Sequence, residues 1–103
     1  MTNVIVLLTD QQALHSIGSY GSQVCRTPNI DTLATDSIRF TRAYTPCALC
    51  TPARASLLTG LYPHKHGAIH NTGTHLPFTP ELIGQDLSIY PSALQESGYQ
   101  LGY

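Results

Sequence analysis

Residues 48–60 read ALCTPARASLLTG, and this stretch carries the strongest structural signal in the 103-residue chain. The pair Thr51-Pro52 opens a predicted helix, because proline is tolerated in the first helical turn. Apolar residues follow, and Gly60 stands just past the predicted end, where helices commonly stop. Cys50 therefore lies where the chain enters a helix.

Cys50 and Arg54 are the candidate chemical groups of this stretch. The positive end of the helix dipole stabilises an anionic nucleophile or a bound anion near Cys50. Arg54 lies four residues later, so its guanidinium projects from the same helical face. Its planar fork of donors suits a tetrahedral oxyanion such as sulfate or phosphate. On local physics alone, a structural cysteine beside a surface arginine is an equally good interpretation.

The segments around this helix predict an α/β arrangement. Residues 3–8 are almost continuously apolar and β-branched at the start, which is typical of a parallel strand buried on both faces. Turn signals and periodicity predict a loop over 11–23, a helix over 30–36, a strand over 37–44, an irregular segment over 61–87, a helix over 91–97 and a strand entry at 99–103.

Composition limits the function classes. The chain is 42% hydrophobic and 11% charged, with five Lys+Arg against six Asp+Glu and a net charge of −1. This balance gives no electrostatic case for nucleic acid or an anionic membrane. No apolar run is long enough to span a bilayer, and Val4–Leu8 is too short for a signal-peptide core. We therefore expect a cytoplasmic location, with periplasmic and secreted locations left open.

Residues 48–60 resemble, at every constrained position, the first signature of the sulfatase family within the alkaline-phosphatase-like superfamily. Collinear similarities to the same family lie at residues 3–10, 27–34, 59–67 and 94–99. The resemblance implies that residues 1–103 are an incomplete, N-terminal portion of a sulfatase catalytic domain. The implied fold is the first part of a mixed, mostly parallel sheet flanked by helices.

The resemblance also implies a nucleophile and a substrate class. Cys50 would be oxidised by a separate maturation enzyme to formylglycine (3-oxoalanine). One hydroxyl of its hydrated form, held on a divalent cation, would attack sulfur and displace the alcohol. The second hydroxyl then lets the sulfated diol collapse and expel sulfate. The guanidinium of Arg54 would hold the anionic end of the nucleophile. The expected substrate is a small-molecule or glycan sulfate ester. The resemblance predicts no particular oligomeric state.

Two further site residues, both expected metal ligands, follow from the same resemblance. Asp10 ends the first predicted strand, at the sheet edge where α/β proteins place ligands, and its carboxylate suits a hard cation, Ca²⁺ or Mg²⁺. Of the two, Ca²⁺ is the expected cofactor. Gln11 stands where the commonest pattern has a second aspartate, so Asp10, Gln11 and modified Cys50 are the expected metal ligands. Without the resemblance, Asp10 is better interpreted as a loop aspartate capping a turn.

The Asp-Gln pair is similar to a branch that contains phosphonate monoester hydrolases and some bacterial sulfatases. Phosphonate and phosphate esters therefore remain alternative substrates. Asn71, twenty-one residues after Cys50, matches an asparagine that contacts substrate in that branch, although a solvated loop asparagine is the simpler interpretation. The loop histidines, which include His64, His66 and His70, are expected at the surface and are not assigned to the site.

Alternatives from other classes rest on the cysteines. Cys47 and Cys50 form a Cys-x-x-Cys pair at a helix start, as in thiol redox proteins, but nothing else along the chain resembles that fold. The spacing of Cys47, Cys50, His66 and His70 fits a zinc finger, yet Pro63 and Gly67 interrupt the required helix. A non-catalytic binding fragment is a third possibility.

Overall fold

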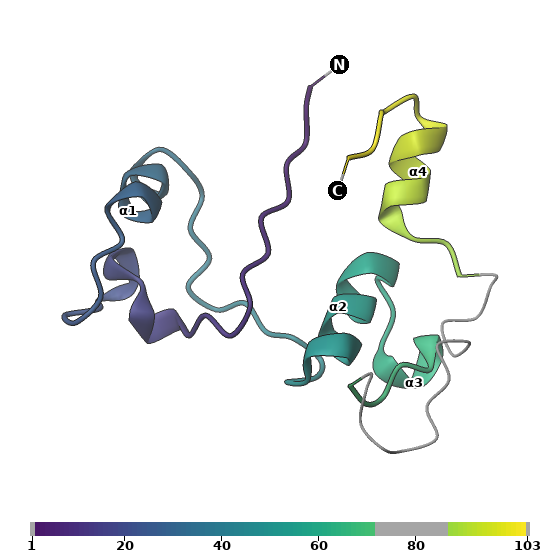
Figure 1. The fold of residues 1–103 in the computed structure, drawn as a ribbon, viewed down its shortest axis with the longest axis horizontal. Coiled ribbons are helices and arrows are strands. Elements are labelled where there is room, and N and C mark those ends of the chain that lie inside the picture. The colour runs from purple at the N-terminus through teal and green to yellow at the C-terminus, as the bar shows by residue number, and fades with distance from the viewer. Residues whose placement is uncertain (1, 72–86, 103) are drawn as a thin grey trace. The chain divides into compact units, whose positions relative to one another are not determined.

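The computed structural model describes residues 2–71 and 87–102, which belong to two compact units, Met1–Ala43 and Tyr44–Tyr103 (Figure 1). The described residues of each unit form short helices joined by irregular chain. The first contains η1 (Leu14–Ser16), η2 (Gly18–Tyr20) and α1 (Pro28–Thr35), and the second contains α2 (Cys50–Thr59), α3 (Pro63–His66) and α4 (Tyr90–Glu96).

A hydrogen-bonded chain joins η2 to α1 in the first unit. The Gly18 N–H donates to Thr27 Oγ1 at 2.8 Å, and that hydroxyl donates to Asp31 Oδ1 at 3.0 Å. The Ser19 N–H donates to the same carboxylate oxygen at 2.6 Å. A Cβ at position 18 would lie 2.4 Å from Asp31 Oδ2, so only glycine allows this approach.

The three predicted strands are not strands in the described part of the chain. Residues 3–8 run extended, and the side chains of Val4–Leu8 are between 53% and 86% exposed. Residues 37–44 are also irregular, and the Tyr20 hydroxyl donates to the Phe40 carbonyl at 2.8 Å there. A strand forms by pairing with a neighbour, and the described residues supply none. The sheet of the predicted α/β fold is therefore not confirmed, whereas its helices are.

The second unit is organised around α2. Its first turn contains Pro52, and it ends at Gly60, whose φ of 69° is the left-handed conformation that favours glycine. α2 contacts both α3 and α4. Among the described residues of this unit, the buried ones are small or polar, namely Pro52, Ala55, Ser56, His66, Ala68 and Pro91.

The predicted helices are observed with shifts of one or two residues. The helix predicted from Thr51 begins at Cys50, the one predicted over 30–36 is α1, and the one predicted over 91–97 is α4. The segment predicted to be irregular from residue 61 contains the short helix α3, and residues 72–86 of it lie outside the described residues. Local proline and glycine signals thus predicted the positions of these helices correctly.

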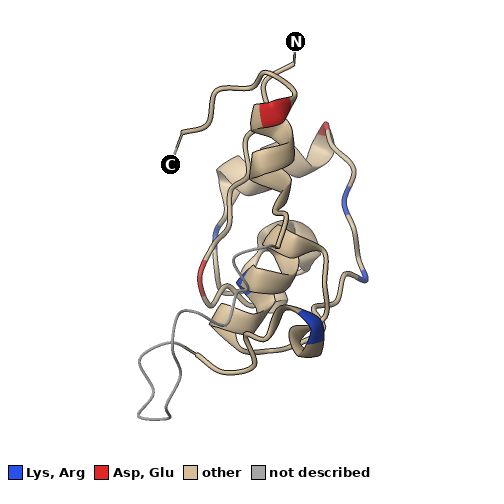
Figure 2. Ribbon diagram, turned by 90° about the vertical axis from the view of Figure 1, so that its right-hand side faces the viewer, with Lys and Arg blue, Asp and Glu red and all other residues tan. Residues whose placement is uncertain are grey.

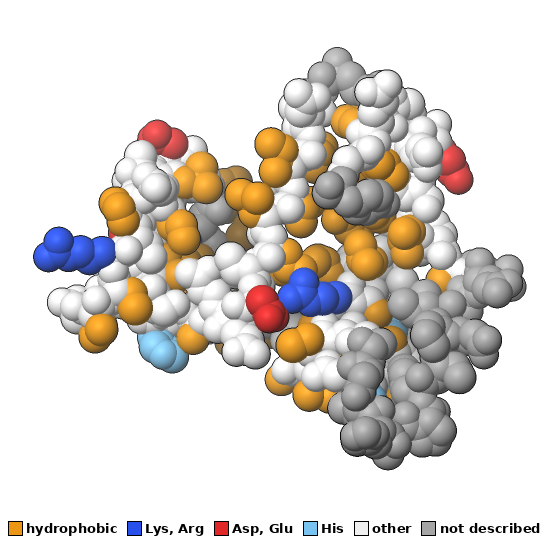
Figure 3. Space-filling model, viewed as in Figure 1, with side chains coloured by type: hydrophobic (Ala, Val, Ile, Leu, Met, Phe, Trp, Pro, Cys, Tyr) orange, Lys and Arg blue, Asp and Glu red, His pale blue; other side chains and the backbone are white. Residues whose placement is uncertain are grey.

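Exposed apolar side chains are common on both units (Figure 3). Charged side chains are few and are spread along the chain rather than gathered on one element (Figure 2). Among the described residues, no helix has the length and apolar character needed to cross a bilayer.

Candidate active site

Cys50 is the first residue of α2. Leu49 before it is extended, with φ −97° and ψ 143°, and its carbonyl accepts the first helical hydrogen bond from the Ala53 N–H at 3.0 Å. This arrangement places the exposed Cys50 side chain at the positive end of the helix dipole. A nucleophile or an anion is stabilised at such a position.

Arg54 lies one helical turn beyond Cys50 and is exposed. Residues four apart on a helix are surface neighbours, so the guanidinium and the Cys50 side chain occupy the same side of α2. A thiol-bearing residue, a helix N-terminus and a guanidinium are groups of the kind that bind a tetrahedral anion, and an anion site at Cys50 and Arg54 stays a prediction.

Asn71 lies at the same end of α2. Its Oδ1 accepts a hydrogen bond from the Thr51 N–H at 3.0 Å, although the two residues are twenty positions apart in sequence. Leu49, at the N-cap position, makes no side-chain cap hydrogen bond, so Asn71 supplies an acceptor from a distant segment. The structure therefore brings Asn71 to the residue next to Cys50. Its predicted contact with substrate stays a prediction.

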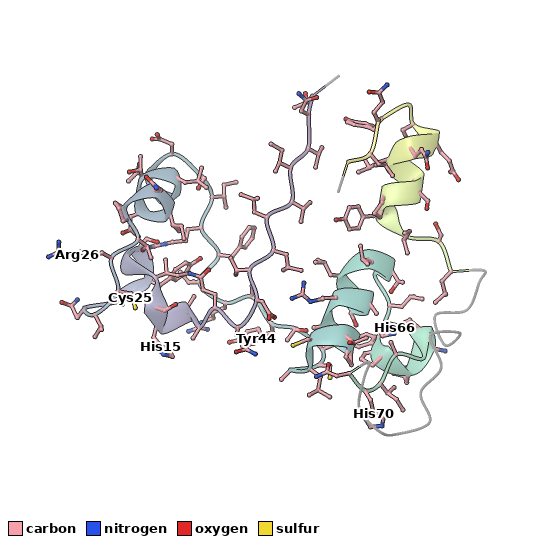
Figure 4. The ribbon with its side chains drawn as sticks, in the orientation of Figure 1. His15, Cys25, Arg26, Tyr44, His66 and His70 are labelled. Atoms are coloured by element: carbon pink, nitrogen blue, oxygen red, sulfur yellow. The ribbon has the colours of Figure 1, made fainter. Side chains whose placement is uncertain are left out.

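His66 connects α3 to α2. It is only 1% exposed, and its Nε2 lies 2.9 Å from Ser56 Oγ on α2. Its Nδ1 accepts a hydrogen bond from the Ala68 N–H at 3.1 Å. In Figure 4, His66 lies where α2 and α3 meet. The sequence-based expectation that this histidine lies at the surface is wrong, because no local pattern signals a bond to a residue ten positions earlier.

The expected metal ligands fall in different units. Asp10 and Gln11 belong to the first unit and Cys50 to the second. Among residues 2–71 and 87–102, no three His, Cys, Asp or Glu side chains are grouped as a metal site. Asp10 and Gln11 offer adjacent carboxylate and amide oxygens, which fit a hard cation in kind. The metal site therefore stays a prediction.

Gln11 has an unusual backbone conformation. Its φ of 53° makes it the one non-glycine residue with a positive φ in the described chain. Glutamine gains nothing locally from this left-handed conformation, and such outliers cluster at functional sites. The conformation is compatible with a functional role for the turn after Asp10, which stays a prediction.

The zinc-finger arrangement does not fit the observed helices. α3 ends at His66, and Gly67 follows with a φ of 78°, so His70 is not on the same helix. Both ring nitrogens of His66 are already engaged by Ser56 and Ala68.

Comparison with known proteins places the whole segment in one group. The family model described as Sulfatase matches residues 2–103. An ulvan-active sulfatase of Formosa agariphila is 37% identical over 96% of this chain and 18% of its own length. An N-acetylglucosamine-6-O-sulfatase of Bacteroides thetaiotaomicron is 35% identical over 95% of this chain and 16% of its length. Bovine arylsulfatase A is 45% identical over 63% of this chain and 13% of its length. No solved structure matches the chain.

Proposed function

We propose, from the premise that this chain belongs to the sulfatase family, that the whole protein hydrolyses sulfate esters with residue 50 as its nucleophile. The chain spans less than a fifth of the length of the relatives described above. The observation that carries the proposal is the position of Cys50, which opens α2 within a segment that the family matches throughout.

The role of each residue on α2 follows from its chemistry. A thiol is a poor nucleophile toward a sulfate ester, and we propose that a maturation enzyme converts Cys50 to formylglycine. The modified residue would supply a hydrated aldehyde as the nucleophile. Arg54, on the same side of α2, would balance the negative charge on the nucleophile and the transferred group.

Asp10 and Gln11 are the residues of this chain that would hold a divalent cation, together with modified residue 50. Their oxygen atoms suit Ca²⁺, which accepts carboxylate and amide ligands in flexible geometry. When bound, such a cation neutralises charge on the transferred group and eases deprotonation of the nucleophile. The left-handed backbone at Gln11 supports a functional constraint at this turn.

A sulfated carbohydrate is the proposed substrate class. Two of the relatives are named for sugar-linked substrates, ulvan and N-acetylglucosamine 6-O-sulfate, and each aligns with nearly the whole of this chain. The second candidate is a phosphonate or phosphate ester. It is favoured by Gln11, because an amide in place of a second carboxylate leaves the predicted metal site with one negative charge fewer.

A substrate panel with two matched variants tests this proposal. The full-length protein, produced with a maturation enzyme, is assayed on an aryl sulfate, an aryl phosphonate monoester and an aryl phosphate. We expect the sulfate to give the highest kcat/KM, Cys50→Ala to abolish turnover and Cys47→Ala to retain it. Undiminished activity in Cys50→Ala would refute residue 50 as the nucleophile, and a higher kcat/KM for phosphonate would favour the second candidate.

A further inference from the structure

His66 makes two hydrogen bonds that fix its protonation pattern. The Ala68 N–H is a donor, so Nδ1, 3.1 Å away, must be an unprotonated acceptor. A neutral imidazole then carries its hydrogen on Nε2, which donates to Ser56 Oγ at 2.9 Å.

These bonds join the same two pieces of chain as the bond of Asn71. Segment 66–71 contacts α2 through His66 at Ser56 and through Asn71 at Thr51. The two α2 residues are five apart, so the contacts lie about 7.5 Å apart along the helix axis. Two separated contacts hold a short segment against a helix in one register, which a single contact cannot do.

A histidine at a buried position of this kind needs a reason. Burying a polar ring costs free energy unless both nitrogens are satisfied, and an apolar side chain would fill the same space without that requirement. The other described histidines of this region, His64 and His70, are exposed. The two bonds of His66 provide what an apolar side chain cannot, which is a fixed orientation of segment 66–71 relative to α2.

We propose that His66 is a positioning residue, which through Ser56 and the Ala68 N–H fixes segment 66–71 so that Asn71 caps α2 beside Cys50. His66 touches neither the nucleophile nor substrate, and it acts through Asn71 and the first turn of α2. Its effect on turnover rests on the proposed function, whereas its effect on the first turn of α2 does not.

Four variants of the full-length protein separate positioning from bulk packing. His66→Phe keeps the ring volume and loses both bonds. His66→Gln keeps a donor that can reach Ser56, whereas His66→Asn keeps an acceptor for the Ala68 N–H. His64→Phe, the same change at an exposed position two residues earlier, is the matched control.

Two readouts are measured, namely hydrogen–deuterium exchange at the Thr51 amide and the steady-state constants for an aryl sulfate. In His66→Phe we expect exchange about fivefold faster and kcat about tenfold lower, with KM within about twofold, because the nucleophile is misplaced while substrate binding persists. His66→Gln should recover more of both quantities than His66→Asn, since it keeps the contact with α2. His64→Phe should match wild type in both.

Wild-type exchange and wild-type kcat in His66→Phe would overturn the inference. If His66→Phe does not fold, His66→Gln is compared with His66→Asn instead. Equal Thr51 exchange rates and equal kcat in these two variants would also overturn the inference. A wild-type protein without activity on sulfate esters would refute the proposed function alone, since the exchange measurement still tests the positioning role.

Discussion

Replacing Asn71 separates its observed role as a helix cap from its predicted role in substrate binding. In Asn71→Ala the Thr51 N–H loses the acceptor that lies 3.0 Å away. Asn71→Asp keeps an oxygen acceptor and adds a negative charge at the N-terminus of α2. Both variants therefore lose any substrate contact made by the amide group. Only Asn71→Ala also loses the helix cap.

The expected magnitude at the Thr51 amide follows from the loss of its capping bond to Asn71. Replacing a capping Asn by Ala costs about 1 kcal/mol of helix stability, which multiplies the local opening equilibrium by about five. The Thr51 amide should therefore exchange about fivefold faster in Asn71→Ala. In Asn71→Asp it should exchange at the wild-type rate or more slowly, because a negative charge near a helix N-terminus contributes about 0.3–1 kcal/mol of stability.

The assay is hydrogen–deuterium exchange on the full-length protein, read from peptides that begin well before residue 51, with kinetics measured in parallel. Asn29→Ala, an exposed asparagine in α1, is the control and should leave the Thr51 amide unchanged. Asn71→Asp should raise KM for an anionic ester, since it places a like charge near Cys50. Unchanged Thr51 exchange in Asn71→Ala, or equally fast exchange in both variants, would refute the capping role.

Three further predictions concern the rest of the site. Peptide mass spectrometry of the active protein should find the aldehyde at residue 50, and an aldehyde at Cys47 instead would contradict the assignment of the nucleophile. Asp10→Ala should abolish activity and lower the metal content after dialysis, whereas wild-type metal content in an inactive variant would point to a structural role for Asp10. The 103-residue chain alone should be inactive and should bind a dye for apolar surface, because Val4–Leu8 is largely exposed. Metal-dependent turnover by a monomeric, dye-negative chain would contradict this last expectation.

The helices could be predicted from the sequence because their signals are local. Proline in the first turn and glycine after the last one gave α2 and α4 to within a residue or two, and Gly60 and Gly98 both have a positive φ. Strands could not be settled in the same way. An apolar run such as residues 3–8 indicates a strand only if a neighbour pairs with it, and pairing is a property of distant chain.

The site shows the same division between local and distant information. The place of Cys50 at the start of a helix, and of Arg54 one turn later, follows from a few consecutive residues. The bonds from Asn71 to Thr51 and from His66 to Ser56 span twenty and ten residues, and no periodic pattern connects the partners. Asn71 could be predicted from a family resemblance, whereas the sequence carries no signal for the buried position of His66.

The small buried side chains of the second unit restrict which substitutions this protein can accumulate. Ala55 on α2 and Ala68 in the segment that follows α3 are 4% and 2% exposed. A side chain with additional methyl groups at either position would need space that a close-packed contact does not offer, and overpacking of this kind typically costs about 1–3 kcal/mol. Glycine, alanine and serine are therefore the residues that positions 55 and 68 should tolerate when this chain is diversified by mutagenesis.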